Sequence, residues 1–174
     1  MEKRENMTDS RKSLAATELK LIGEAFAGWA PPEAMTDSLQ LSDAEYDEVM
    51  SFDGMTWRQV AFDQVETNAD AVFWFSPEAF CYYLPGFLAA GLTENRWESN
   101  AYDALSGMLD RSPEPNYWDD FFLPRWPRLS DGEIEAVRSW VRWIESVLPG
   151  AFHPNTNERV DGTLTLLRVF RNQI

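Results

Sequence analysis

Three kinds of side chain in this sequence could do chemistry: one cysteine, one histidine and a large set of carboxylates. Cys81 stands among aromatic residues in an apolar segment, where we expect a small buried side chain and not a nucleophilic thiolate. His153 precedes Pro154 in a polar loop, and as the only histidine it has no second imidazole with which to hold a metal. Nothing in the spacing favours a catalytic dyad of these two side chains. We therefore predict no catalytic residue, no metal and no cofactor, and expect that the protein is not an enzyme.

The carboxylates are dense between residues 37 and 53, but they lack the register of a calcium loop, which places oxygens at fixed odd positions around a glycine. One interpretation is the solvated face of a helix, whose inner face would carry Leu41, Tyr46, Val49 and Met50. The other is a docking surface for a basic partner. On that hypothesis the partner-binding candidates are Asp43, Asp47 and Glu48.

A second candidate surface is the segment NYWDDFFLPRWPR, residues 116–128, which mixes aromatic, acidic and arginine side chains as binding hot spots do. Its prolines restrict the unbound chain, which lowers the entropy lost on binding. The partner-binding candidates here are Tyr117, Trp118, Asp119, Asp120 and Trp126. The alternative is that these aromatic rings fold back and cover the core.

The run FSPEAFCYYLP, residues 75–85, predicts a helix start, with Ser76 as N-cap and Pro77 at the first helical position. Pro85 lacks a backbone donor, so we expect the helix to kink or restart there. A kink could open a cleft, with Tyr82 as hydrogen-bond donor and Glu78 as acceptor for a small ligand. A deep pocket and a carboxylate of raised pKa would favour that alternative.

The same run resembles the signature of a family of small bacterial proteins of uncharacterised function. Members are similar to this chain upstream as well, where an apolar, glycine-containing turn precedes a tryptophan, here Phe52, Asp53, Gly54 and Trp57. The resemblance covers residues 21–92, about two fifths of the chain. It implies a shared fold, and it implies no activity.

Helix signals dominate the rest of the chain. Apolar spacing predicts helices over residues 13–29, 43–52, 56–65 and 77–92, from 93 to about 108, and over 131–148. Capping boxes are expected at Ser42 with Glu45, Thr56 with Gln59, and Ser130 with Glu133. Residues 111–129, with four prolines, read as a long ordered loop. Residues 71–75 and 162–170 fit strand and helix templates equally well.

The predicted fold is therefore all-α or nearly so: a single domain of about six helices over residues 13–174, with a proline-kinked central helix and at most a minor strand pair. Residues 1–12 are polar and are expected to form a flexible N-terminal segment without the apolar core of a signal peptide. The most apolar run has five residues, too few to cross a membrane, and a single cysteine permits no internal disulfide. These features favour a cytoplasmic protein.

The net charge is −14, and residues 21–120 contain nineteen acids against three basic residues. Such a field repels nucleic acid and anionic lipid and speeds association with a basic protein. Acidity that serves solubility alone is the other interpretation. We expect a cytoplasmic acidic binding protein that neutralises or regulates a basic protein partner, with an immunity protein against a basic toxin domain as its most specific form. The alternatives are a small enzyme or ligand-binding protein using Glu78 and Tyr82, and a mimic of nucleic acid.

Overall fold

The structure is a computed structural model of the 174-residue chain; it describes residues 2–147 and 156–171, with side chains over 13–147 and 158–171. The described residues form eight α-helices and three short 3-10 helices and contain no strand, so the all-α class is confirmed and the helices outnumber the six expected. The elements are α1 (Glu2–Ala25), α2 (Asp43–Met50), η1 (Trp57–Gln59), α3 (Phe62–Thr67), α4 (Ala71–Trp74), α5 (Pro77–Glu94), α6 (Asn100–Leu109), η2 (Pro115–Tyr117), η3 (Trp126–Arg128), α7 (Asp131–Val147) and α8 (Thr156–Arg171).

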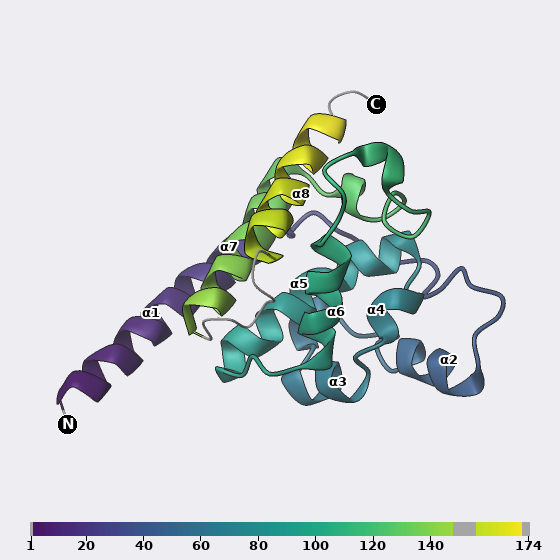
Figure 1. The fold of residues 1–174 in the computed structure, drawn as a ribbon. Coiled ribbons are helices and arrows are strands. Elements are labelled where there is room, and N and C mark those ends of the chain that lie inside the picture. Colours follow the sequence, from purple (N-terminus) through teal and green to yellow (C-terminus); the bar gives the residue numbers. More distant parts are fainter. Residues whose placement is uncertain (1, 148–155, 172–174) are drawn as a thin grey trace.

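Helix α5 is the centre of the molecule, and thirteen of its eighteen residues are buried. Helix α1 packs against both α5 and α7, and α8 packs against α7 and η3, so α1, α7 and α8 lie side by side (Figure 1). The small helices α2 and α4 pack together on the right-hand side of Figure 1, where α4 lies between α2 and the loop that joins α6 to α7. No helix in the described residues combines the length and the apolar character of a membrane span.

The start of α5 is as the sequence predicts, because Ser76 Oγ accepts the Ala79 N–H at 3.1 Å and Pro77 occupies the first turn. Of the two outcomes expected at Pro85, a kink or a restart, the restart is wrong, since α5 continues through that residue to Glu94. The helix expected to begin at Thr93 is wrong as well. Thr93 lies in the last turn of α5, and α6 begins at Asn100 behind the N-cap Ser99.

Two glycines explain how neighbouring elements hold α5 together across Pro85. A Cβ on Gly86 would lie 2.6 Å from the carbonyl oxygen of Trp57 in η1. A Cβ on Gly91 would lie 2.3 Å from the hydroxyl of Tyr102 in α6 and from the carbonyl oxygen of Arg96. Only a residue without a side chain permits these approaches. The chain at Trp57 and Tyr102 therefore packs directly against the backbone of α5 after Pro85.

The N-terminal helix differs from its predicted range of 13–29. The backbone of residues 2–12, expected as a separate flexible segment, belongs to α1, which begins at Glu2 and ends at Ala25. Trp29 lies beyond the helix, where its indole N–H donates to the carboxylate of Glu133 in the capping box of α7. This contact ties the segment after α1 to the start of α7.

Among the remaining predictions, capping boxes between residues close in the sequence are confirmed, and those for some longer segments are not. The capping boxes of α2 and α7 are confirmed, with Glu45 and Glu133 accepting the N–H groups of Ser42 and Ser130 at 2.7 and 2.6 Å. Residues 56–65, expected as one helix, contain η1 and α3 separated by an extended Val60. The two ambiguous segments lie in α4 and α8, so the minor strand pair is wrong. His153 lies outside the described residues.

Candidate binding surface

The two residues of the predicted cleft lie in different environments. Glu78 is exposed, and its carboxylate accepts a hydrogen bond from Arg128 at 2.6 Å, which holds the pKa of Glu78 below its ordinary value. Tyr82 is buried in α5. Neither residue lines any of four pockets in the described part of the chain, which have volumes of about 470, 350, 330 and 230 Å³. The raised carboxylate pKa that would favour a small-molecule site is therefore not found at Glu78.

The thiol of Cys81 is fully buried, and its Sγ lies 3.6 Å from the carbonyl oxygen of Arg125. Burial raises the pKa of this thiol to about 12, so the thiolate is scarce at neutral pH. This confirms the interpretation of Cys81 as a small buried side chain. The described residues contain no group of three or more potential metal ligands.

In the loop between α6 and α7, two of the predicted contact residues are core residues. Trp118 is buried, with its indole N–H donating to the carbonyl oxygen of Ser112 at 3.0 Å and its ring against Phe170 of α8. Trp126 is also buried and packs edge-on against Phe80 of α5. Their rings fold back over the core, so neither offers its side chain to a partner in this structure.

The other predicted residues of this loop differ in their availability. Tyr117 is 73% exposed. Asp119 has structural contacts, because one carboxylate oxygen pairs with Arg111 at 2.8 Å and the other accepts the N–H of Phe122 at 2.8 Å. Asp120 is exposed and forms no ion pair within the described residues. Tyr117 and Asp120 are thus the members of this set that face solvent without a structural role.

Helix α2 presents an acidic surface, with one change from the prediction. Asp43 and Asp47 are exposed and Glu48 is half-buried. Tyr46, expected on the inner face, is 49% exposed. Val49 is the one buried residue of this short helix. Asp43, Tyr46 and Asp47 are three and four residues apart and so share one helix face.

Helix α4 connects this surface to the loop, which the sequence analysis did not foresee. Glu48 of α2 lies near Asp70, the N-cap residue of α4, whose negative charge contributes to the raised pKa of Glu48. One turn later the ring of Phe73, 36% exposed, lies 6.0 Å from the ring of Phe121 in the loop. The run AVFWF hid this residue, because a segment without polar residues has no periodicity to show which side chain faces outward.

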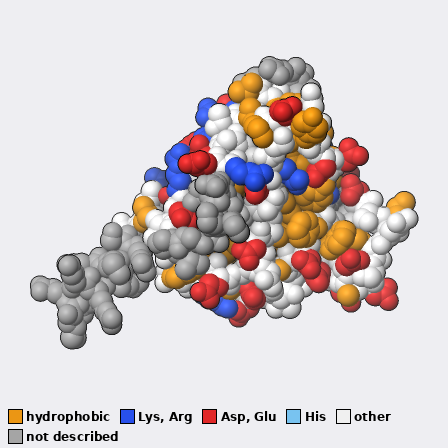
Figure 2. Space-filling view, in the orientation of Figure 1, with side chains coloured by type: hydrophobic (Ala, Val, Ile, Leu, Met, Phe, Trp, Pro, Cys, Tyr) orange, Lys and Arg blue, Asp and Glu red, His pale blue; other side chains and the backbone are white. Residues whose placement is uncertain are grey.

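The three segments together form a surface that we name the acidic aromatic face. Figure 2 shows apolar side chains gathered over α4 and next to the loop, with acidic side chains at the margins. Tyr46, Phe73 and Tyr117 are the exposed large aromatic side chains among the described residues, and each of the three segments contributes one of them. Its members are Asp43, Tyr46, Asp47, Glu48, Asp70, Phe73, Tyr117 and Asp120.

The negative charges of the face are not paired with positive side chains in the described part of the chain. Within the part of the chain that the structure describes, none of its five carboxylates forms an ion pair. Burial, and then the negative charge of Asp70, raise the pKa of Glu48 above its ordinary value. A neighbouring cation would lower that pKa, so the shift agrees with the lack of a cation beside Glu48.

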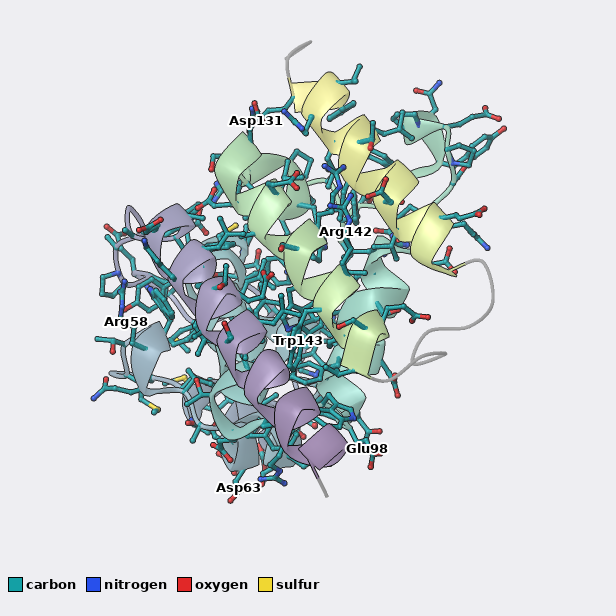
Figure 3. All side chains as sticks on the ribbon, turned by 90° about the vertical axis from the view of Figure 1, so that its left-hand side faces the viewer. Arg58, Asp63, Glu98, Asp131, Arg142 and Trp143 are labelled. Atoms are coloured by element: carbon teal, nitrogen blue, oxygen red, sulfur yellow. The ribbon has the colours of Figure 1, made fainter. Side chains whose placement is uncertain are left out.

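A pocket of about 470 Å³ lies elsewhere, between α7 and α8. Its walls combine apolar side chains such as Val141 and Leu164 with charged ones, and Arg142 lies between the two helices (Figure 3). Arg138 and Arg142 both pair with Asp161 there, at 2.7 and 3.5 Å. These charges are engaged in holding α8 against α7.

Comparison with known proteins adds no relative: neither the models of known protein families, nor the curated proteins, nor the solved structures gave a match to this chain. The resemblance of residues 75–85 to a family of small bacterial proteins therefore stays a prediction. The function has to be argued from the surface itself.

Proposed function

We propose that this chain is an acidic binding protein of the cytoplasm, which neutralises or regulates a basic protein partner through its acidic aromatic face. The observation that carries the proposal is the coincidence of unpaired carboxylates with exposed aromatic rings on one surface. Carboxylates held near one another without cations repel, and a basic partner relieves that repulsion on binding. The aromatic rings supply apolar contact area, as they do at binding hot spots.

The net charge of −14 is expected to raise the rate at which a basic partner associates. The field steers a basic partner toward the protein, and the contact then excludes that partner from its other ligands by occlusion. Tyr117, Tyr46 and Phe73 supply the anchoring rings, because Trp118, one of the predicted partner-binding residues, is buried. The most specific form of the proposal is an immunity protein that binds and blocks a basic toxin domain. Two features support that form: the negative charge of the chain, and a set of predicted site residues in which we recognise no catalytic arrangement.

The test is capture of the partner from a lysate of the source cells, with two variants of equal charge. The face variant converts three carboxylates to amides: Asp43→Asn, Asp47→Asn and Asp120→Asn. The control variant makes the same change in charge at exposed positions outside the face: Glu24→Gln, Glu98→Gln and Glu158→Gln. Both variants carry a net charge three units less negative than that of the native chain.

The native protein and the control variant are expected to retain the same basic protein, and the face variant is expected to lose it. Raising the salt concentration from about 50 to about 500 mM should release the partner, because ions screen exposed charges over a few ångströms at high salt. Equal loss in both variants would mean that total charge, and not this face, determines binding. Capture of no protein by the native chain would contradict the proposal.

A further inference from the structure

Two arginines in this chain each stack on an aromatic ring and form an ion pair with a nearby carboxylate. The guanidinium of Arg96 lies 3.9 Å from the centre of the Phe62 ring and pairs with Asp63. The side chain of Arg96 thus stacks on an aromatic ring and pairs with a carboxylate at the same time. The planar guanidinium suits both tasks, since it can lie on a ring while its N–H groups point at a carboxylate.

The second example is in the loop between α6 and α7. The guanidinium of Arg111 lies 5.2 Å from the centre of the Phe122 ring and pairs with Asp119 at 2.8 Å. The acid here precedes the aromatic residue by three positions. Both examples therefore contain one phenylalanine, one nearby aspartate and one arginine.

The acidic aromatic face contains the same combination without the arginine. Phe73 follows Asp70 by three positions, which is the spacing of Phe122 after Asp119. Tyr46 stands between Asp43 and Asp47 on one face of α2. Within the described side chains, no cation stacks on Phe73 or Tyr46 and no ion pair involves these aspartates.

The surroundings of Phe73 extend the comparison. Its neighbour Phe121 already carries a guanidinium, that of Arg125, at 4.1 Å from the ring centre. Phe73 lies next in the row, 6.0 Å from Phe121, and its ring is open to solvent. The guanidinium of Arg125 and the rings of Phe121 and Phe73 thus follow one another. The last of them is an exposed ring three positions after Asp70.

We propose that arginine side chains of the basic partner occupy these two places, each stacking on Phe73 or Tyr46 while pairing with the adjacent aspartate. This inference rests on the proposed function and adds the residue type that the face selects. Lysine satisfies the charge but not the geometry, because its ammonium group is compact, more strongly hydrated and not planar. The face therefore discriminates arginine from lysine at equal charge.

The experiment measures binding of two basic peptides that are identical except that every arginine of one is lysine in the other. Isothermal titration of the full-length protein at low salt gives both affinities. We expect the arginine peptide to bind about fivefold more tightly, the effect of a partly desolvated cation on an aromatic ring. The double variant Tyr46→Leu with Phe73→Leu keeps apolar side chains but removes the rings, and it should bring the two affinities to within about twofold. The control Leu39→Ala, at a side chain 98% exposed outside the face, should leave the preference unchanged.

Each outcome has one meaning. If both peptides bind the native protein equally, the face recognises positive charge alone; the proposed function then stands and the arginine inference is overturned. If the preference persists in the double variant, the selected contact lies elsewhere and the inference is again overturned. If neither peptide binds, the proposed function fails and the inference falls with it. An unfolding curve of each variant confirms that the native fold is present before the titration.

Discussion

The two ends of the molecule treat charge in opposite ways. Along α7 and α8, the arginines pair with carboxylates of both helices and of neighbouring segments: Arg138, Arg142, Arg159, Arg168 and Arg171 with Glu135, Asp161, Asp110 and Asp131. On the acidic aromatic face the carboxylates have no such partners in the described residues. Figure 2 shows the same division, with many of its blue side chains over α7 and α8 and many of its red ones near α2 and α4.

This difference separates charges that hold the fold from charges that are free to bind. The C-terminal helix α8 buries only a narrow apolar stripe, which includes Val160, Leu164 and Leu167, so ion pairs at its edges contribute to its docking. The carboxylates of the face stabilise no helix contact through a cation, and their mutual repulsion costs stability. Unpaired charge at one end is therefore the feature that most needs a partner to explain it.

The largest expected effect comes from breaking the paired end. Arg138 is buried, with its guanidinium 2.8 Å from Glu135, 2.7 Å from Asp161 and 3.0 Å from the hydroxyl of Thr165. We expect Arg138→Met to lower the free energy of unfolding by about 2 kcal/mol, because it removes the contacts of a buried guanidinium with two carboxylates and a hydroxyl. Urea denaturation measures the change.

The control for this variant is Arg142→Met on the same helix. Arg142 is 66% exposed, and its ion pairs are longer, at 3.5 and 3.9 Å. Its loss should cost less than about 0.5 kcal/mol. Equal effects of the two substitutions would show that the buried network is not what holds α8.

A smaller effect of opposite sign is expected at the face. Asp47 and Glu48 lie in the last turn of α2, where the helix dipole disfavours negative charge and no basic side chain compensates it. The double variant Asp47→Asn with Glu48→Gln should raise the free energy of unfolding by about 0.5 kcal/mol at low salt. The gain should shrink at about 0.5 M salt, where exposed charges are screened. Destabilisation by the variant would mean that these carboxylates have structural partners after all.

The smallest effect is the pH dependence of Glu48. Its pKa is raised above the ordinary value of 4.5 by burial and then by Asp70, so the folded state binds this proton more tightly than the unfolded state. Stability therefore falls as the pH rises through this pKa, and the charged form is the one that destabilises. The advantage of Glu48→Gln over the native protein should be present at pH 7, should fade as the pH is lowered through the raised pKa toward 4.5, and should be absent below 4.5. Chemical denaturation at several pH values follows it, and an advantage that grows toward low pH would contradict the assignment.

The fold could be predicted where the signal is local. Ser42, Ser76 and Ser130 each cap a helix through side chains within three residues, so the sequence alone contains the whole interaction. The restart expected at Pro85 failed because the packing of η1 and α6 against Gly86 and Gly91 depends on residues distant in the sequence. Local propensity cannot include such contacts.

The candidate site shows the same limit. The acidic residues of α2 and the exposed Tyr117 were found from composition and spacing. The sequence left open whether Trp118 and Trp126 face a partner or cover the core, and only the contacts with Phe170 and Phe80 show that their rings complete the core. Phe73 was missed because it stands in an apolar run, and its exposure is decided by which neighbours cover the rest of α4.

The measurement that tests the central claim most directly is a map of where a basic partner binds, made by recording backbone amide NMR shifts during titration with the arginine peptide. The account predicts that the changes concentrate in α2, in α4 and around residues 117–121, and that they disappear in the face variant with Asp43→Asn, Asp47→Asn and Asp120→Asn. Changes spread evenly over all exposed carboxylates, or concentrated between α7 and α8, would contradict it.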